Sequence, residues 1–302
     1  NQAPGDQPSV EDFLEWGMTR QPGPWRAYDD APPGPPPVTR VGRGELRVTW
    51  VGHATVLVQI DGLNVLTDPV WSHRIGPVSW AGPQRVRPPA IRFEDLPYID
   101  VVLLSHNHYD HFDIPTIRRL AERDHPRIVT GLGNADILED EEIDGGVELD
   151  WWESEEVSPG VRITVVPAQH FSMRGVCDRD ATLWAGFVIE AEGGPVYFAG
   201  DTAWGPHFAQ IRARFGPVRL AMLPIGAYLP RKIMAPMHVD PAEAVAAHKT
   251  LGAQASVAMH HGTFPQADEG QDAPVRDLKA ALRRAGEPES RTGASCPSSA
   301  CG

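Results

Sequence analysis

The sequence predicts an αββα sandwich, in which two mixed β-sheets stack face to face and helices cover their outer faces. Short apolar runs separated by turn signals recur in both halves of the chain, and helical patterns follow some of these runs. Polar clusters stand directly after several runs, as they do where loops meet at the carboxyl ends of strands in layered α/β proteins. No period of about 20–50 residues repeats, which argues against a solenoid.

The composition is that of a globular protein. The 302 residues are 41% hydrophobic and 22% charged, in the usual range for folded domains. The net charge of −13 argues against a nucleic-acid partner, because phosphate contacts need clustered Lys and Arg. No apolar run approaches the roughly 18 residues of a membrane-spanning helix. Three cysteines, two of them in the last seven residues, exclude a disulfide scaffold and a cysteine-rich zinc site.

Proline marks the first segment of the chain. Nine of the 30 prolines lie in the first forty residues, which show no apolar periodicity and predict an extended or disordered surface arm. Trp16, Trp25 and Tyr28 indicate that parts of this arm dock on the body. The chain begins with Asn rather than Met, so a removed upstream signal or anchor stays open. The predicted parts are a proline-rich arm at 1–45, a folded domain at 46–286 and a polar tail at 287–302.

The first half of the domain begins with strands. An Asp-Gly pair at 61–62 stands between two apolar runs, which is a hairpin signal. A short, wholly apolar run at 99–104 is typical of a strand buried on both faces. Pro115 suits the first turn of a helix. The predicted elements are strands at 46–60 (broken at Gly52-His53) and 63–68, a long ordered loop at 70–98, a strand at 99–104 and a helix from Pro115.

The second half repeats this rhythm. A Gly-Gly pair at 193–194 separates two strand patterns, and Gly286 ends the last helical pattern. Helical patterns follow the later strands, which places helices outside a second sheet. The predicted elements are strands at 161–168, 182–190, 195–200, 219–224 and 255–259, and helices at 240–251 and 273–286.

The densest group of chemically active side chains follows the 99–104 strand. His106, His108, Asp110 and His111 are four potential metal ligands in six residues. In a loop they can surround two ions about 3.5–4 Å apart. His106 and His108 alternate and can share one ion, which leaves Asp110 and His111 for another. Catalytic zinc needs further ligands and an open position, and the later strand ends offer His170, Asp201 and His260.

The run HNHYDH at 106–111 resembles the His-x-His-x-Asp-His signature of the metallo-β-lactamase superfamily. The chain is also similar to one branch, the N-acyl-phosphatidylethanolamine-hydrolysing phospholipase D family and its bacterial relatives. PIGAYLPR at 224–231 and HVDP at 238–241 are the motifs that point to this branch. The resemblance extends over residues 46–265, in the stretches WVGHATVLVQIDGLNVLTDPVWS, GPQRVRPPAI, DVVLLSHNHYDHFD, PAQHFSMRG, LWAGFVIE, FAGDTAW, PIGAYLPRKIMAPMHVDPAEAV and AMHHGTF.

The resemblance implies a dinuclear zinc site, in which other divalent transition metals could take the place of zinc. One Zn²⁺ would be held by His106, His108 and His170, and the other by Asp110, His111 and His260. Asp201 and a hydroxide would bridge the two ions. In this scheme the hydroxide attacks phosphorus and the leaving alkoxide needs a proton, for which Asp110 and His238 are the two open candidates.

Several assignments keep a simpler alternative. His261 competes with His260, and the family pattern favours His260. His238 could cap the helix that begins near Asp240. Asp68 and His53 are expected to orient ligands from behind, or else to serve only a turn and the core. Tyr228 and Arg231 are expected to contact substrate, or else only to pack and to form a surface salt bridge.

The function implied by the resemblance is phospholipase D-type hydrolysis of N-acyl-phosphatidylethanolamine, which gives phosphatidic acid and an N-acylethanolamine. The same site on the same fold could instead serve a lactonase or a β-lactam hydrolase, because fold does not fix substrate. A non-enzymatic metal-binding protein is the remaining alternative. We expect a phospholipid or other small ester as partner, no nucleic acid, and a cytoplasmic or peripherally membrane-associated protein.

Overall fold

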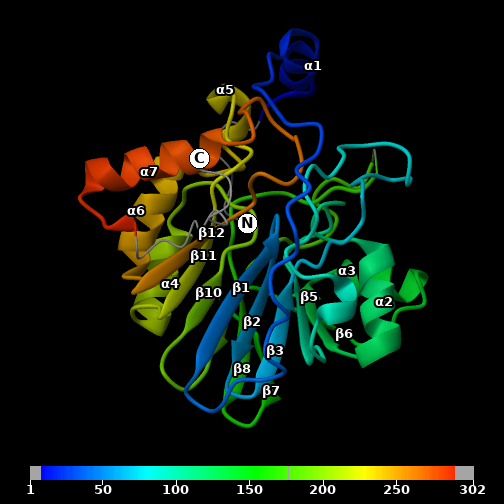
Figure 1. Cartoon of the computed structure of the whole chain (residues 1–302), viewed down its shortest axis with the longest axis vertical. Coiled ribbons are helices and arrows are strands. Elements are labelled where there is room, and N and C mark those ends of the chain that lie inside the picture. Colours follow the sequence, from blue (N-terminus) through cyan, green and yellow to red (C-terminus); the bar gives the residue numbers. More distant parts are fainter. Residues whose placement is uncertain (1–7, 176, 290–302) are drawn as a thin grey trace.

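A computed structural model describes residues 8–175 and 177–289. Within these residues the chain forms two mixed β-sheets that pack face to face, with helices on both outer faces (Figure 1). The predicted αββα sandwich is therefore confirmed. Most of the predicted tail at 287–302 lies outside the described residues.

The first sheet has the order β1-β2-β3-β4-β5-β6. Its first three strands are antiparallel neighbours, and β3 through β6 run parallel. Its strands are β1 (Leu46–Gly52), β2 (Thr55–Ile60), β3 (Leu63–Thr67), β4 (Val101–Leu104), β5 (Arg127–Gly131) and β6 (Gly146–Leu149).

The second sheet has the order β12-β11-β10-β9-β8-β7. Here β10, β11 and β12 run parallel, while β7 through β10 are antiparallel neighbours. Its strands are β7 (Ser154–Ser158), β8 (Val161–Val166), β9 (Gly186–Glu190), β10 (Val196–Phe198), β11 (Leu220–Pro224) and β12 (Ala255–Met259).

The helices divide between the two outer faces (Figure 1). Ile117 of α2 (Ile114–Asp124) and Leu138 of α3 (Asn134–Asp140) pack with Val102 and Leu104 against the outer face of the first sheet. The second sheet is covered by α4 (His207–Phe215), α6 (Pro241–Leu251) and α7 (Ala273–Ala285).

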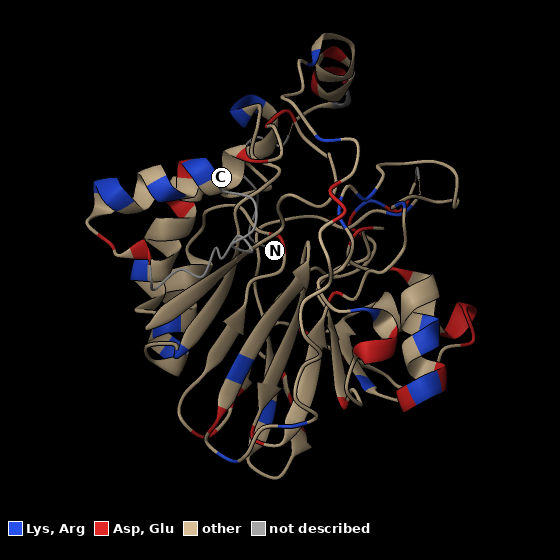
Figure 2. Ribbon diagram, viewed as in Figure 1, with Lys and Arg blue, Asp and Glu red and all other residues tan. Residues whose placement is uncertain are grey.

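Strand β4 shows why one short run is apolar throughout. Val101 and Leu103 pack into the core between the sheets, whereas Val102 and Leu104 pack under α2 and α3. All four are buried, as the 99–104 run predicted. Figure 2 shows the charged residues mostly on helices and loops around these layers, as apolar packing between the sheets requires.

The N-terminal arm corrects one prediction. It is not simply extended, because Val10–Thr19 form helix α1. Ser9 and Asp12 close a capping box that starts the helix. The expected docking is confirmed: Trp16 Nε1 donates to Asp268 at 2.8 Å and Trp25 Nε1 to the Glu269 carbonyl at 3.0 Å.

Other elements were not predicted. Strands β5, β6 and β7 and helix α3 occupy residues 127–158, where charged residues interrupt the apolar pattern. Helices α4 and α5 (Arg231–Met234) were also missed. The 70–98 segment is a loop, as expected, apart from an isolated bridge between Arg74 and Gln84 and a 3₁₀ turn at Phe93–Asp95.

Candidate metal centre

The candidate site lies where strands of both sheets end. His106–His111 follow β4, His170 follows β8, Asp201 follows β10 and His260 follows β12 directly. These strands run in the same direction within their sheets, so their carboxyl ends meet at one edge. The His260 amide donates to the His53 carbonyl at 2.9 Å, which joins the two sheets at the site.

Three imidazoles form what we call the first donor set: His106, His108 and His170. His108 Nδ1 lies 2.8 Å from His106 Nε2 and 3.3 Å from His170 Nε2. Ligands about 2.0–2.1 Å from a tetrahedral zinc would be ~3.3 Å apart. Burial lowers the pKa of His108 to about 3 and of His170 to about 4, and that of His106 well below its usual value. These rings are neutral and can offer lone pairs to a metal.

Asp110, His111 and His260 form the second donor set, and Asp201 lies beside it. Asp201 Oδ2 is 3.1 Å from His111 Nε2 and 2.9 Å from His260 Nε2. Asp110 Oδ2 is 3.2 Å and 3.4 Å from the same two nitrogens. Asp201 also groups with His106 and with His170, so its carboxylate adjoins both donor sets.

Charge is balanced differently in the second set. Burial alone would lower the pKa of both its imidazoles. The Asp201 and Asp110 carboxylates instead raise the pKa of His111 well above its usual value and that of His260 to about 9. Burial opposes ionisation of the two carboxyls as well, yet the charge of His111 holds the pKa of each well below its usual value. A divalent cation could replace the protons that balance these carboxylates.

Hydrogen bonds fix which nitrogen of three imidazoles faces inward. The Met237 carbonyl can only accept, so His170 Nδ1 donates to it at 3.0 Å, and Nε2 of the neutral ring carries no proton. Asp68 accepts in the same way from His111 Nδ1 at 2.6 Å. Ser105 Oγ gives its proton to Asp68, so His106 Nδ1 donates to this oxygen at 2.9 Å. Metal-binding histidines are usually held in this manner.

Unpartnered polar atoms support the fit to a metal. Among the described residues, Asp201 Oδ1 is buried without a hydrogen-bond partner, and His111 Nε2 and His260 Nε2 have only their ion pairs with the carboxylates. Leaving such an atom buried and unsatisfied costs about 1–3 kcal/mol. A bound cation would satisfy this oxygen and take the place of the imidazole protons, and the buried His/Asp cluster can therefore bind metal.

Three non-glycine residues at this edge have a left-handed backbone conformation. His53, Asp68 and His260 have φ values of +55°, +34° and +56°. Non-glycine residues rarely adopt such left-handed conformations, which persist where the surrounding structure over-determines them. All three side chains face the donor sets.

The structure places two expected supporting residues against the second donor set. Asp68 accepts from His111, as described, and from the Ser105 amide at 2.8 Å. His53 Nε2 donates to Asp110 Oδ2 at 2.7 Å and belongs to the same close group of potential ligands. His261, the competitor of His260, instead stacks on Trp50 with ring centroids 4.8 Å apart.

His238 faces the site. Its Nδ1 is 3.9 Å from Asp201 Oδ2 and has no hydrogen-bond partner among the described residues. The alternative that His238 caps a helix is wrong, because the Asp240 side chain caps α6 by accepting from the Ala242 and Glu243 amides.

Tyr228 and Arg231 are engaged with other protein groups. The Tyr228 hydroxyl donates to Asp277 of α7 at 2.5 Å. Arg231 donates to the His238 carbonyl at 2.9 Å and pairs with Glu243 at 2.8 Å. Arg231 therefore supports the turn that carries His238, and its substrate contact stays a prediction.

Two polar residues of the site escaped sequence reasoning. Gln266 Nε2 donates to Asp110 Oδ2 at 2.7 Å. The buried Glu269 carboxylate accepts from the Ala227 amide at 2.6 Å and the Leu229 amide at 3.1 Å. A single Gln or Glu in a loop has no spacing signal, so only the fold reveals these contacts.

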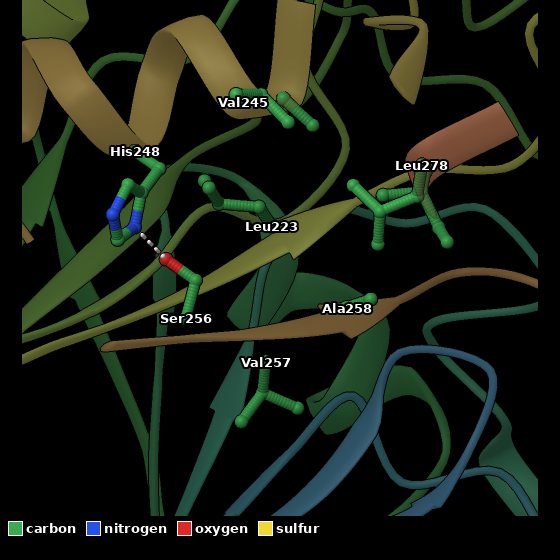
Figure 3. Close-up of a pocket in the computed structure, with 9 residues that line it drawn as sticks. Leu223, Val245, His248, Ser256, Val257, Ala258 and Leu278 are labelled. Atoms are coloured by element: carbon green, nitrogen blue, oxygen red, sulfur yellow. Dashed lines mark hydrogen bonds between the residues drawn. The ribbon is translucent and has the colours of Figure 1, made fainter. Parts of the chain in front are cut away.

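A separate small cavity lies between the second sheet and its helices (Figure 3). His248 Nδ1 is 2.7 Å from Ser256 Oγ at its side, and the other lining groups are apolar. No member of either donor set lines it, so it is a packing gap apart from the candidate centre. Its lining comprises Leu223, Ile225, Ala244, Val245, His248, Ser256, Val257, Ala258 and Leu278.

Comparisons with known proteins agree with this geometry. Residues 63–261 match the family model described as the beta-lactamase superfamily domain. The N-acyl-phosphatidylethanolamine-hydrolyzing phospholipase D 1 of Caenorhabditis elegans is 42% identical over 231 residues, which cover 73% of this chain and 65% of the worm protein. The chain thus spans slightly under two thirds of that relative.

One further relative and one solved structure are also similar to this chain. A metal-dependent hydrolase of Methanopyrus kandleri is 30% identical over 237 residues, covering 78% of this chain and 92% of that protein. The solved structure of a metallo hydrolase from Ignicoccus hospitalis has a TM-score of 0.59 at 24% identity, covering 80% of this chain and 91% of that one. The latter likeness shows the shared fold.

Proposed function

We propose that this chain, which belongs to the beta-lactamase superfamily, is a dinuclear zinc phosphodiesterase. Within that superfamily it belongs to the branch of the N-acyl-phosphatidylethanolamine-hydrolysing phospholipases D, and it is a metal-dependent hydrolase. Its substrate would be N-acyl-phosphatidylethanolamine, and its products phosphatidic acid and an N-acylethanolamine. The observation that carries the proposal is the pair of adjacent donor sets joined by Asp201.

In this proposal the first donor set holds one ion, the second donor set holds the other, and Asp201 contacts both. Two bound zinc ions would supply a nucleophile by lowering the pKa of water, and would neutralise charge on the phosphodiester. The protein contributes ligands whose orientation is fixed beforehand by Ser105, Met237 and Asp68.

Asp110 and His238 are the two candidates to protonate the leaving alkoxide. Asp110 Oδ2 already accepts from His53 and Gln266, and such bonds favour its ionised form. His238 Nδ1 is buried at the site without a hydrogen-bond partner among the described residues. Burial lowers the pKa of His238 well below its usual value, so its ring is neutral. We favour His238 over Asp110 as a relay, in which one ring nitrogen would give its proton to the leaving alkoxide while the other takes up a proton from water.

A phospholipid substrate implies contact with a lipid surface. In the described ranges, no helix is both long and apolar enough to cross a bilayer. Trp80, at 79% exposure, projects from the 70–98 loop, while Leu14 and Met18 are exposed on α1. These apolar side chains are our candidates for local contact, since Trp suits an apolar–polar boundary.

The proposal is tested with one zinc-loaded preparation assayed against a long-chain N-acyl phospholipid, a lactone and a β-lactam. We expect the phospholipid to be cleaved fastest, with zinc analysis giving two ions per chain. Faster lactone or β-lactam turnover would replace the substrate assignment and leave the metal centre standing. A metal content near zero after gentle purification would contradict the metal centre itself. The Asp201→Ala variant controls for contaminating hydrolases.

A further inference from the structure

Gln266 touches a proposed metal ligand from outside the two donor sets. Its Nε2 lies 2.7 Å from Asp110 Oδ2. An ionised carboxylate accepts only, so the amide must present its NH₂ group to Asp110. The residue is half-buried in the loop between β12 and α7.

Asp110 is held from two sides. His53, at the turn between β1 and β2 of the first sheet, donates to the same oxygen at 2.7 Å. Gln266 approaches from a loop of the second sheet. Two donors on one carboxylate oxygen restrict its rotation, and thereby fix how Asp110 faces His111 and His260.

The loop that carries Gln266 is itself anchored. Asp268 accepts from Trp16 Nε1 at 2.8 Å and pairs with Arg20 at 3.1 Å. Glu269 accepts from the Ala227 and Leu229 amides, as described. The N-terminal arm therefore holds this loop on one side, and the 227–229 segment holds it on the other. The backbone that carries Gln266 is thus fixed where its amide contacts Asp110.

We propose that Gln266 is a positioning residue for Asp110 and thereby sets the metal affinity of the second donor set. The inference rests on the proposed two-metal centre. Gln266 would act by preorganising a ligand, because Asp110 already points at the site before a cation arrives. The first donor set has no such contact with Gln266 and should be unaffected.

Zinc titration of the metal-free protein by calorimetry tests this inference without using activity. Gln266→Leu removes the donor while nearly keeping the side-chain volume. Gln266→Asn keeps the amide but is one methylene too short to span the contact. We expect both variants to weaken one of the two zinc sites by about 10–100-fold and to leave the other unchanged.

Gln59→Leu is the matched control. Gln59 is buried in β2, where its Nε2 donates to the Val38 carbonyl and to Asn64 Oδ1, remote from the donor sets. This control should lose stability without losing zinc affinity. Circular dichroism of all variants before titration checks that they fold.

The outcomes separate the inference from the proposed function. Two unchanged zinc affinities in both Gln266 variants would overturn the positioning role, as would tighter zinc binding. A normal zinc affinity for Gln266→Asn beside a weak one for Gln266→Leu would also overturn it, because the loss would then follow side-chain polarity and not the hydrogen bond to Asp110. A wild-type protein that binds fewer than two zinc ions would instead contradict the two-metal centre.

Discussion

The two donor sets offer a metal ion different kinds of ligand. The first consists of three neutral imidazoles whose partners are a hydroxyl and a backbone carbonyl. The second combines imidazoles with carboxylates, and Asp68, His53 and Gln266 support it from outside. The first set needs only the correct orientation of its imidazole rings, whereas the second must also compensate buried negative charge.

This contrast predicts unequal behaviour. Neutral ligands cost little to bury without a metal, because burial only lowers their pKa. Buried carboxylates need compensation, which here comes from neighbouring imidazoles and amide donors. Changes in the supporting residues should therefore affect the second set much more than the first, and variants of Asp201 should affect both.

Asp201→Ala should have the largest effect. It removes the carboxylate that adjoins both sets, so both zinc affinities and turnover should fall by more than about 100-fold, beyond the usual effect of losing an outer partner. Metal analysis after dialysis, together with turnover, measures this. Asp140→Ala, at an exposed position on α3, is the control. Near-normal turnover would mean that Asp201 does not join the two sets.

His238→Ala should separate chemistry from metal binding. If His238 passes a proton, turnover should fall by about 10²–10⁴-fold while both ions are retained. Loss of one ion would instead make His238 a ligand beside His170 and Asp201, with which it groups. Unchanged turnover would exclude both roles.

Much of this comparison could be predicted from the sequence. His106–His111 stand directly after an apolar strand, and His170, Asp201 and His260 each follow another, so their positions marked them as candidate ligands. Their assignment to two metal ions came from the family resemblance. Fold class followed from the same alternation of strands and helices. These signals are local and periodic, and single-sequence reasoning detects them.

The supporting contacts could not be predicted in the same way. Gln266 and Asp110 are 156 residues apart and meet only because the two sheets end at one edge. Helix α1 was missed because only Phe13 and Trp16 of its ten residues pack against the body, and two apolar positions are too few to establish a helical period. This short helix is stabilised by packing against the cluster that contains Met234 and Met237.

Asp68→Asn should weaken the second set more than the first, because Asp68 contacts His111 directly and reaches His106 only through Ser105. The amide oxygen can still accept from His111 Nδ1, but the negative charge that supports the imidazole is lost. We expect about a tenfold loss in the zinc affinity of the second set and a smaller loss in that of the first, measured by the same titration. Asp61→Asn, in the β2–β3 turn, is the matched control. An equal loss at both zinc sites would end the distinction between the two sets.

Trp16→Phe should give the smallest effect and tests how far the support of the second set extends. The change keeps an aromatic ring against the cluster around Met234 but deletes the hydrogen bond to Asp268. One such bond is worth about 1 kcal/mol, which should appear as a lower urea midpoint. Trp80→Phe, at a side chain 79% exposed, should change stability by less than about 0.5 kcal/mol. Equal midpoints for the two variants would mean that the Trp16 hydrogen bond does not hold the Gln266 loop, which would then depend on the Arg20–Asp268 pair and the Trp25 bond to Glu269.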